Sequence, residues 1–214
     1  MRFLITAGPT REPIDPVRYL SNRSSGKMGY AIAEAAIEAG HEVILISGPV
    51  ALNRPHRAAV IAISTSDQMF EAVQRQVCNC DVLVMCAAVA DYKPASISKD
   101  KIKKRQAVLS LELVPTRDIL TSLAKDRQFV LVGFAAETEN IEANALKKLH
   151  EKNCDIIVAN DARLAMESHE NEVEIFCRDG ETRKISRAPK TIIAHELVKI
   201  FENYVEKRLT KKIV

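Results

Sequence analysis

Short, nearly continuous apolar segments recur along the first three quarters of the chain, at residues 2–7, 41–47, 57–64, 80–88, 128–135 and 154–159. Segments of this kind are typical of strands buried on both faces of a sheet. Between several of them, apolar residues recur at spacings of three and four, which predicts helices from Ser25 to Gly40, from Asp67 to Val77, and around Ile141, Ala145 and Leu149. Strands alternating with helices predict an α/β, Rossmann-like domain with a mainly parallel sheet and helices on both faces.

Two segments depart from this alternation. Within residues 108–114 (VLSLELV), apolar and polar positions alternate from residue 109 to residue 113, and residues 172–185 contain a hairpin signal, Asp179-Gly180, between two strand-like runs. We expect both to form antiparallel additions to the parallel core. A C-terminal helix is expected over the apolar positions from Ile193 to Val205. We find no internal repeat and no long linker, so we expect a single domain over residues 1–214.

Composition narrows the class of protein. The formal net charge of +3 is too small to predict nucleic-acid binding from the whole-chain field. No apolar run approaches the roughly 20 residues of a membrane span, and the first residues turn polar too early for a signal peptide. An odd count of five cysteines then suggests reduced thiols in a cytoplasmic protein. Cys78 and Cys80 lack the spacing of a zinc site.

The connection from residue 6 to residue 29 is the first candidate for function, because roughly 2–6 residues would suffice to join a strand to a helix. It leads into a helix N-terminus, whose free amides can bind an anion. It contains no G-x-G-x-x-G, and Gly26-Lys27 lacks the other residues of a P-loop. Its donors to a carboxylate or phosphate are Arg18, Asn22, Arg23 and Lys27. A polar capping loop is the alternative.

Small residues also follow two of the central strands, in AAVADYKP (residues 87–94) and GFAAETEN (133–140). Such residues let a ligand approach the backbone closely. Asp91 could accept hydrogen bonds from a sugar or base or hold a divalent ion, or it could simply cap a turn. Lys148 and Lys152 share one helical face at i and i+4, which is also the spacing of an ordinary surface pair.

A basic segment at about residues 92–107 could be a mobile flap that brings ammonium groups to a polyphosphate. It could equally be a solvated loop or an RNA contact. Only Tyr92 is near enough to stack a base, so the RNA interpretation lacks aromatic support. The basic residues are Lys93, Lys99, Lys101, Lys103, Lys104 and Arg105.

These motifs, in the order TAGPTREPIDPVRYLSNRSSGKMG, AAVADYKP, DKIKK, GFAAET and IIVAND, closely resemble the phosphopantothenoylcysteine synthetase family of coenzyme A biosynthesis. The resemblance extends from Met1 through the C-terminal helix. It implies a ligase that joins 4′-phosphopantothenate to L-cysteine through an acyl-cytidylate, with release of pyrophosphate and then CMP. In many bacteria the family forms one half of a bifunctional protein whose other half is a flavin-dependent decarboxylase, and that half is missing here.

The resemblance also implies roles for individual residues. Asn22 would be the catalytic residue that converts the acyl-cytidylate, and Arg18 and Ala88 would bind the acyl substrate together with Asn22. Lys101 would reach the triphosphate from the flap, with Lys103 and Lys104 as weaker candidates. The remaining nucleotide-binding residues would be Cys86, Ala87, Ala88, Asp91, Phe134, Ala135, Ala136, Glu137, Lys148 and Lys152. Asp91 would serve the nucleotide directly or through a metal ion, and the metal ligands stay unassigned.

By the same resemblance, the cofactor would be Mg²⁺ or another divalent cation, CTP would be the co-substrate, and no flavin is expected. A homodimer and cooperation with a separate decarboxylase are expected partners, whereas nucleic acid and membrane are not. The alternatives are an ATP-using version of the ligase, a catalytically inert relative, and a non-enzymatic RNA-binding module. A nicotinamide-dependent oxidoreductase is disfavoured because the glycine fingerprint is absent and Tyr204 is followed four residues later by Arg208 rather than Lys.

Overall fold

The computed structural model describes residues 1–104, 108–123, 127–165 and 168–213, with only the backbone described for residues 164, 165 and 211–213. Its main sheet has the strand order β12-β11-β10-β9-β6-β1-β4-β5. The parallel strands are β1 (Arg2–Ala7), β4 (Glu42–Ser47), β5 (Ala59–Ala62), β6 (Val82–Met85), β9 (Val130–Glu137) and β10 (Ile156–Asp161). Two antiparallel strands, β11 (Glu170–Cys177) and β12 (Thr182–Pro189), extend one edge. The expected Rossmann-like fold class is confirmed.

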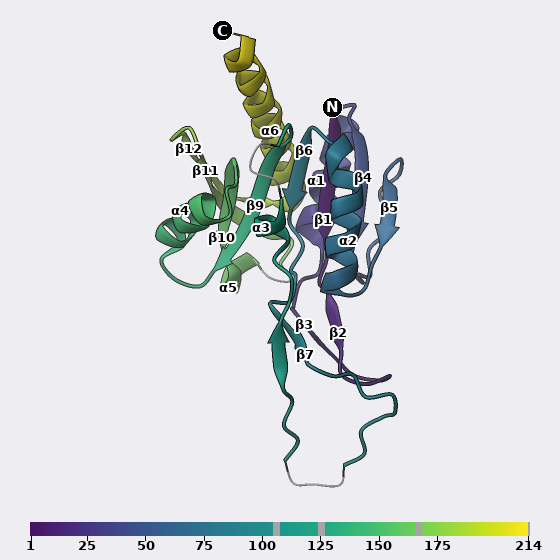
Figure 1. Ribbon diagram of the computed structural model, residues 1–214. Helices are drawn as coiled ribbons and strands as arrows, with labels where there is room; N and C mark the ends of the chain where they lie inside the picture. The colour runs from purple at the N-terminus through teal and green to yellow at the C-terminus, as the bar shows by residue number, and fades with distance from the viewer. Residues whose placement is uncertain (105–107, 124–126, 166–167, 214) are drawn as a thin grey trace.

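Helices cover both faces of this sheet (Figure 1). One face packs against α1 (Lys27–Glu38) and α6 (Lys190–Ile213), and the other against α2 (Ser66–Gln76), α3 (Ile119–Ser122) and α4 (Ile141–Glu151). The 3₁₀ turn η1 (Val77–Asn79) and the short α5 (Ala162–Ala165) complete the helices. In β1, Phe3 and Ile5 belong to the first core and Leu4 to the second. The central strands β1, β6, β9 and β10 therefore bury alternate residues in opposite layers, which explains their continuous apolar sequences.

Local patterns located most of these elements. β1 has the bounds of the apolar run at residues 2–7, and the hairpin predicted at Asp179-Gly180 is the β11–β12 pair. Gly180 has φ of +90°, which a tight turn between two strands favours. The prediction that residues 57–64 form a buried strand is wrong in part, because β5 is shorter, lies at the edge of the sheet and is partly exposed.

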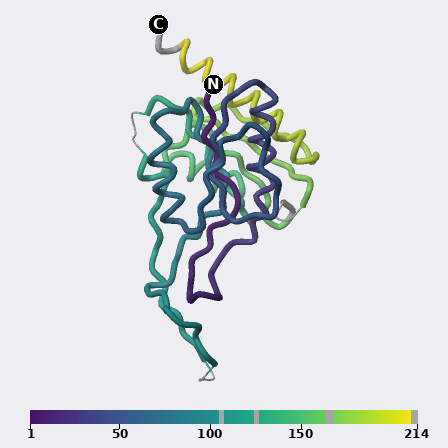
Figure 2. Tube along the Cα trace, turned by 90° about the vertical axis from the view of Figure 1, so that its right-hand side faces the viewer, coloured from purple at the N-terminus to yellow at the C-terminus, as the bar shows by residue number. Residues whose placement is uncertain are grey.

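An arm built from residues 92–104 and 108–115 projects from the carboxyl edge of the sheet, away from both chain termini (Figures 1 and 2). Its base is the antiparallel pair β7 (Tyr92–Pro94) and β8 (Leu113–Pro115). The prediction of a strand over residues 108–114 is therefore wrong for most of its length. Residues 108–112 are irregular, and the short strand that does form pairs within the arm rather than with the main sheet.

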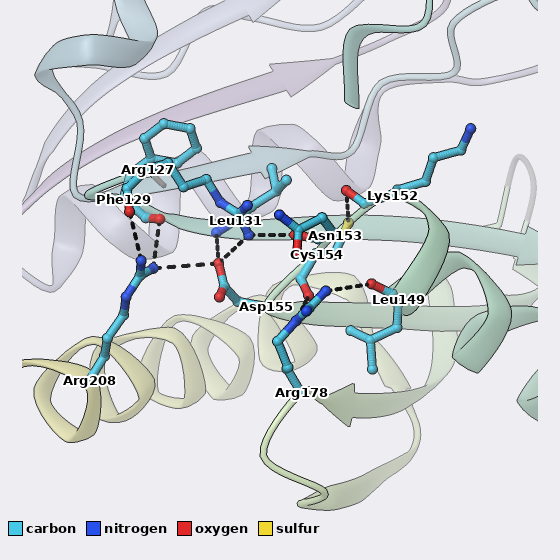
Figure 3. A network of polar contacts seen from close by, with 10 residues as sticks. All are labelled: Arg127, Phe129, Leu131, Leu149, Lys152, Asn153, Cys154, Asp155, Arg178 and Arg208. Atoms are coloured by element: carbon cyan, nitrogen blue, oxygen red, sulfur yellow. Dashed lines mark hydrogen bonds and ion pairs between the residues drawn. The ribbon is translucent and has the colours of Figure 1, made fainter. Parts of the chain in front are cut away.

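A network around the buried ion pair of Arg127 and Asp155 joins α6 to β9 and β10 (Figure 3). Arg127 Nη2 donates to Asp155 Oδ2 at 2.8 Å, and the same oxygen accepts from the Leu131 amide at 2.8 Å. From α6, Arg208 donates to the Phe129 carbonyl at 2.8 Å and to the Arg127 carbonyl at 2.7 Å. Its Nη1 lies 3.6 Å from Asp155 Oδ2. One carboxylate thus links the segment before β9, the start of β10 and the last helix.

In the part of the chain that the structure describes, every helix is too short or too polar to cross a lipid bilayer.

Candidate functional site

Main-chain hydrogen bonds join the loops at the carboxyl edge of the central strands. The Ala88 amide donates to the Gly8 carbonyl at 2.9 Å, and the Thr10 amide donates to the Ala88 carbonyl at 3.1 Å. Nearby, Gly48 lies so close to Pro9 that a Cβ atom at Gly48 would come within 1.9 Å of the Pro9 oxygen. Backbone pairing therefore continues beyond the strands and forms a close-packed floor for a site at the edge where parallel sheets bind ligands.

A first cavity, which we call the central cavity, opens at the N-terminus of α1 and has a volume of about 150 Å³. Gly26 precedes this helix with φ of +77°, and no side chain caps it. The first amides of α1 therefore point toward the cavity and make its end electropositive. The lining residues are Ser24, Ser25, Gly26, Lys27, Met28, Gly29, Cys86, Ala87, Ala88, Phe134, Ala136, Asn160, Asn171 and Lys190.

A second cavity of about 370 Å³, the lateral cavity, lies beside it. Ala87 and Phe134 line both cavities, so the two share a wall made at the ends of β6 and β9. The other lining residues of the lateral cavity are Met85, Val89, Ala90, Asp91, Thr116, Arg117, Asp118, Ile119, Leu120, Lys148 and Lys152.

Lys148 of α4 and Lys152, which caps the C-terminus of that helix, contribute positive charge to the lateral cavity. Lys148 Nζ donates to the Phe134 carbonyl at 2.7 Å, and burial lowers the pKa of this lysine from its usual range. Lys152 Nζ lies 2.5 Å from Asp118 Oδ2. Burial raises the pKa of Asp118, but hydrogen bonds from Lys152 and Thr121 outweigh that effect, so the net pKa is lowered. Both lysines thus enter the cavity in fixed positions.

Arg117, which also lines the lateral cavity, is held in place by Asp67 and Phe70. Its Nε donates to Asp67 Oδ1 at 3.0 Å, and its guanidinium carbon lies 4.1 Å from the centre of the Phe70 ring. Asp67 also pairs with Lys93, at the base of the arm. The hydrogen bond from Lys93 is the main reason that the pKa of Asp67 is lowered, and the two cations together outweigh its burial. The network fixes a planar cation where a nucleotide could stack or pair.

The loop between β1 and α1 contains its own small hairpin, β2 (Arg11–Pro13) and β3 (Tyr19–Ser21). Asn22 follows β3 and donates through Nδ2 to the Ala88 carbonyl at 3.2 Å. It lines a third cavity of about 460 Å³, which shares Ser24, Ser25 and Lys27 with the central cavity. Asn22 is therefore brought against Ala88, the residue with which the sequence grouped it.

The structure gathers most, but not all, of the expected site residues. Cys86, Ala88 and Ala136 line the central cavity, Asp91, Lys148 and Lys152 line the lateral cavity, and Ala87 and Phe134 line both.

Four expected residues lie elsewhere. Ala135 is buried in the core on the α2 side of the sheet, and Glu137 accepts a hydrogen bond from Asn144. Lys101 is exposed on the arm, as are Lys103 and Lys104, and Arg105 lies outside the described residues. Arg18 is at the junction of the β1–α1 loop and the arm.

Sequence reasoning missed Thr116, Arg117 and Asp118 in the lateral cavity, and Asn160 and Lys190 in the central cavity. A signal for the first group existed, since Asp118 caps α3 by accepting from the Thr121 amide at 3.0 Å. A polar turn just before a short apolar stretch indicates such a cap. Asn160 lies at the carboxyl end of β10, where parallel strands present ligand-binding side chains.

The chemistry available here is binding and charge stabilisation. Cys86 is the thiol in the central cavity, and burial raises its pKa to about 12, so it is a poor nucleophile at neutral pH. Among the described residues, no group of three or more His, Cys, Asp or Glu side chains could enclose a metal ion. The site instead offers lysines, an arginine, amide donors and a helix N-terminus, which suit anionic and polyphosphate ligands.

Comparison with known proteins gives the site a family context. Residues 1–204 match the model of the DNA/pantothenate metabolism flavoprotein C-terminal domain. The chain belongs to this family. A family relative, the coenzyme A biosynthesis bifunctional protein CoaBC of Bacillus subtilis (strain 168), is 46% identical over 200 residues, which is 91% of this chain but 49% of the relative. The chain thus spans about half the length of the curated relatives that it matches.

Solved structures of the family agree with this assignment. The crystal structure of the C-terminal domain of a CoaBC protein has a TM-score of 0.83 and 45% identity, covering 96% of both chains. The DNA/pantothenate metabolism flavoprotein from Streptococcus pneumoniae has the same TM-score at 26% identity, covering 95% of this chain and 99% of its own. The family resemblance expected from the sequence motifs is confirmed, and the fold is that of the C-terminal domain of CoaBC proteins.

Proposed function

We propose that this chain is a phosphopantothenate-cysteine ligase that uses CTP. The carboxylate of 4′-phosphopantothenate attacks the α-phosphorus of CTP, and pyrophosphate leaves, giving an acyl-cytidylate. The amino group of L-cysteine then attacks the acyl carbon, CMP leaves, and the amine loses a proton to form the amide. The products are 4′-phosphopantothenoylcysteine, CMP and pyrophosphate.

The observation that carries this proposal is the wall shared by the central and lateral cavities. A nucleotide in the lateral cavity and an acyl group in the central cavity would meet beside Ala87 and Phe134. The carboxylate and the amine are already nucleophiles, so the protein must chiefly position them and stabilise charge. That requirement matches a site made of cations and amides.

Each group of residues has a role in this scheme. Lys148 and Lys152, with Asp91, bind the nucleotide in the lateral cavity. Asn22 is placed against Ala88 and donates its amide to the oxyanion that forms when cysteine attacks. A donor of this kind is worth roughly 2.7–4 kcal/mol of barrier. Lys101 contacts the triphosphate from the arm.

A divalent cation such as Mg²⁺ fits the site in a limited way. Mg²⁺ is commonly held by one or two carboxylates and the phosphates of a substrate. Asp91 is the carboxylate at a suitable place in the lateral cavity, and the triphosphate would provide the other oxygens. When bound, the cation would supply neutralisation of phosphate charge. We assign no flavin to this chain.

A homodimer is part of the proposal, because the arm exposes apolar side chains that a second copy could cover. Their exposed fractions are 72% for Val108, 55% for Leu109, 38% for Leu111 and 44% for Leu113. In such a dimer the arm of one protomer, with Lys101, would approach the site of its partner. A decarboxylase on a separate chain would use the product, and we place both reactions in the cytoplasm.

The test is pyrophosphate release from 4′-phosphopantothenate and Mg²⁺ with either CTP or ATP, with and without L-cysteine, followed by mass analysis of the products. We expect release with CTP and amide formation only when cysteine is present. Equal rates with ATP would overturn the choice of nucleotide and leave the ligase. No release with either nucleotide, from a protein with the expected fold by circular dichroism, would overturn the proposed activity.

A further inference from the structure

Asp15, in the β1–α1 loop, is a buried carboxylate that the proposed reaction does not use. It is 3% exposed, and its two oxygens accept hydrogen bonds from five donors. Oδ1 accepts from the amides of Val17 at 2.9 Å and Arg18 at 2.8 Å. Oδ2 accepts from Arg18 Nε at 3.0 Å, Arg18 Nη2 at 2.6 Å and the Ile102 amide at 3.1 Å.

The last of these donors belongs to a different part of the molecule. Ile102 is in the arm, next to Lys101, and is 87 residues away from Asp15 in the sequence. Arg18 Nη2 donates to the Ile102 carbonyl as well, at 2.6 Å. A further main-chain bond runs from the Ser98 amide to the Ile14 carbonyl at 3.0 Å. The β1–α1 loop and the arm are therefore joined at two neighbouring points.

Only an ionised carboxylate satisfies this arrangement. Burial raises the pKa of Asp15, but the hydrogen bonds from the Arg18 side chain and from the amides of Val17, Ile102 and Arg18 outweigh burial and hold the pKa well below its usual range. An asparagine has one acceptor oxygen and an NH₂ group that would face donors. It could preserve part of the local turn, but not the guanidinium pair and the arm contact together.

We propose that Asp15 is a positioning residue that couples the acyl-substrate residue Arg18 to the arm carrying Lys101. The inference rests on the proposed function, since it concerns the same reaction. Asp15 fixes the plane of the Arg18 guanidinium and, through Ile102, the root of the segment that brings Lys101 to the triphosphate. Binding of the acyl substrate at Arg18 and approach of the arm to the nucleotide are thereby parts of one arrangement.

The first experiment compares Asp15→Asn with the wild type and with Asp81→Asn. Asp81 accepts a hydrogen bond from the Arg2 amide at 2.7 Å, at the opposite edge of the sheet, so this control removes the same charge far from the site. Hydrogen exchange is measured in the peptide that covers residues 98–104, and KM is measured for 4′-phosphopantothenate and CTP. For Asp15→Asn we expect at least roughly 10-fold faster exchange in this peptide and a rise in both KM values of roughly 10-fold or more, with a smaller change in kcat. Asp81→Asn should change neither.

A second variant separates coupling from a local turn. Ile102→Pro removes the arm amide that donates to Asp15 and restricts the backbone at Lys101, while the hydrogen bonds from Val17 and Arg18 to Asp15 are kept. Ile97→Pro imposes the same kind of backbone restriction elsewhere in the arm and serves as the control. Coupling predicts that Ile102→Pro raises KM for the acyl substrate and Ile97→Pro does not. If Asp15 only stabilises its own turn, Asp15→Asn lowers the melting temperature while exchange and both KM values stay at wild-type levels, and the proposal is overturned. An inactive wild type would refute the ligase, but the exchange data would still decide the coupling.

Discussion

The buried ion pair between Asp155 and Arg127 allows a quantitative test of how the last helix is held to the sheet. The side chains are 11% and 4% exposed. Replacing Asp155 with alanine removes the acceptor of both the Arg127 guanidinium and the Leu131 amide. The guanidinium stays charged, because arginine does not deprotonate in proteins. The variant therefore leaves a buried cation and a buried amide without their carboxylate.

The expected cost follows from this count. Removing one partner of a buried ion pair destabilises a protein by about 3–5 kcal/mol, and the orphaned Leu131 amide favours the upper part of that range. In a chain of this size, a loss of 1 kcal/mol lowers the melting temperature by about 2–4 °C. We expect Asp155→Ala to melt roughly 6–20 °C below the wild type. Asp155→Asn keeps an oxygen that can accept from the Leu131 amide, so its melting temperature should lie between those of Asp155→Ala and the wild type.

Urea unfolding followed by far-ultraviolet circular dichroism measures this loss, with the slope of the transition as a check that the same surface is exposed. Asp179→Asn is the matched control, since it removes one negative charge from an exposed turn. The asparagine oxygen can still accept the hydrogen bond from the Glu181 amide. Its free energy of unfolding should lie within about 0.5 kcal/mol of the wild-type value. A loss below about 1 kcal/mol for Asp155→Ala, at an unchanged slope, would show that the network does not hold the helix as described.

Three further predictions concern the proposed reaction. Asn22→Asp should release pyrophosphate in a first turnover but form amide roughly 100- to 1,000-fold more slowly, measured by rapid quench; normal steady-state amide formation would remove Asn22 from the mechanism. Lys148→Met should weaken CTP binding measured by calorimetry. It should lower the free energy of unfolding by no more than the contribution of one hydrogen bond, about 1 kcal/mol. Burial lowers the pKa of Lys148, so this lysine loses its proton at a lower pH than a free lysine. As the pH rises through that lowered pKa, the affinity of the wild type for CTP should fall because the ammonium charge is lost, and the free energy of unfolding should rise because a buried charge is removed. An affinity for CTP that does not change with pH would contradict this. Lys101→Gln should raise KM for CTP and leave the melting temperature unchanged. An unchanged KM would indicate that the basic segment of the arm is a solvated loop without a role in nucleotide binding.

Local sequence patterns were enough for the parallel strands except the edge strand β5, whose length and burial were overestimated. β1 and the β11–β12 hairpin were found because burial on both faces and a turn dipeptide each leave a signature within a few residues. The alternation in residues 108–114 misled, because its apolar side chains are exposed within this chain rather than packed on a sheet. An alternating pattern indicates that one face of a segment is apolar, but it does not identify the sheet, helix or other molecule that covers that face.

The candidate site was predictable only where its residues lie near the strand ends that form it. Asn22 and Ala88 meet because the loops that contain them follow β1 and β6, which are neighbours in the main sheet. Asp15 lies within the first motif, but nothing in the sequence singled it out, because its partner Ile102 is 87 residues away. Arg117 was missed for the same reason, as its partner Asp67 lies on α2. Long-range pairing of this kind is set by tertiary structure.

The floor made by Gly8, Pro9, Thr10, Gly48 and Ala88 has a consequence for how such a protein can diverge. Its hydrogen bonds use amides and carbonyls that almost every residue type possesses, so most side chains above it can be exchanged without moving it. Gly8 and Gly48 are exceptions, because Gly8 has φ of +76°, which residues other than glycine rarely adopt, and a Cβ atom at Gly48 would collide with Pro9. Descendants of this fold can therefore change the base or the acyl group that they accept while inheriting the same foundation, provided that these two glycines are kept.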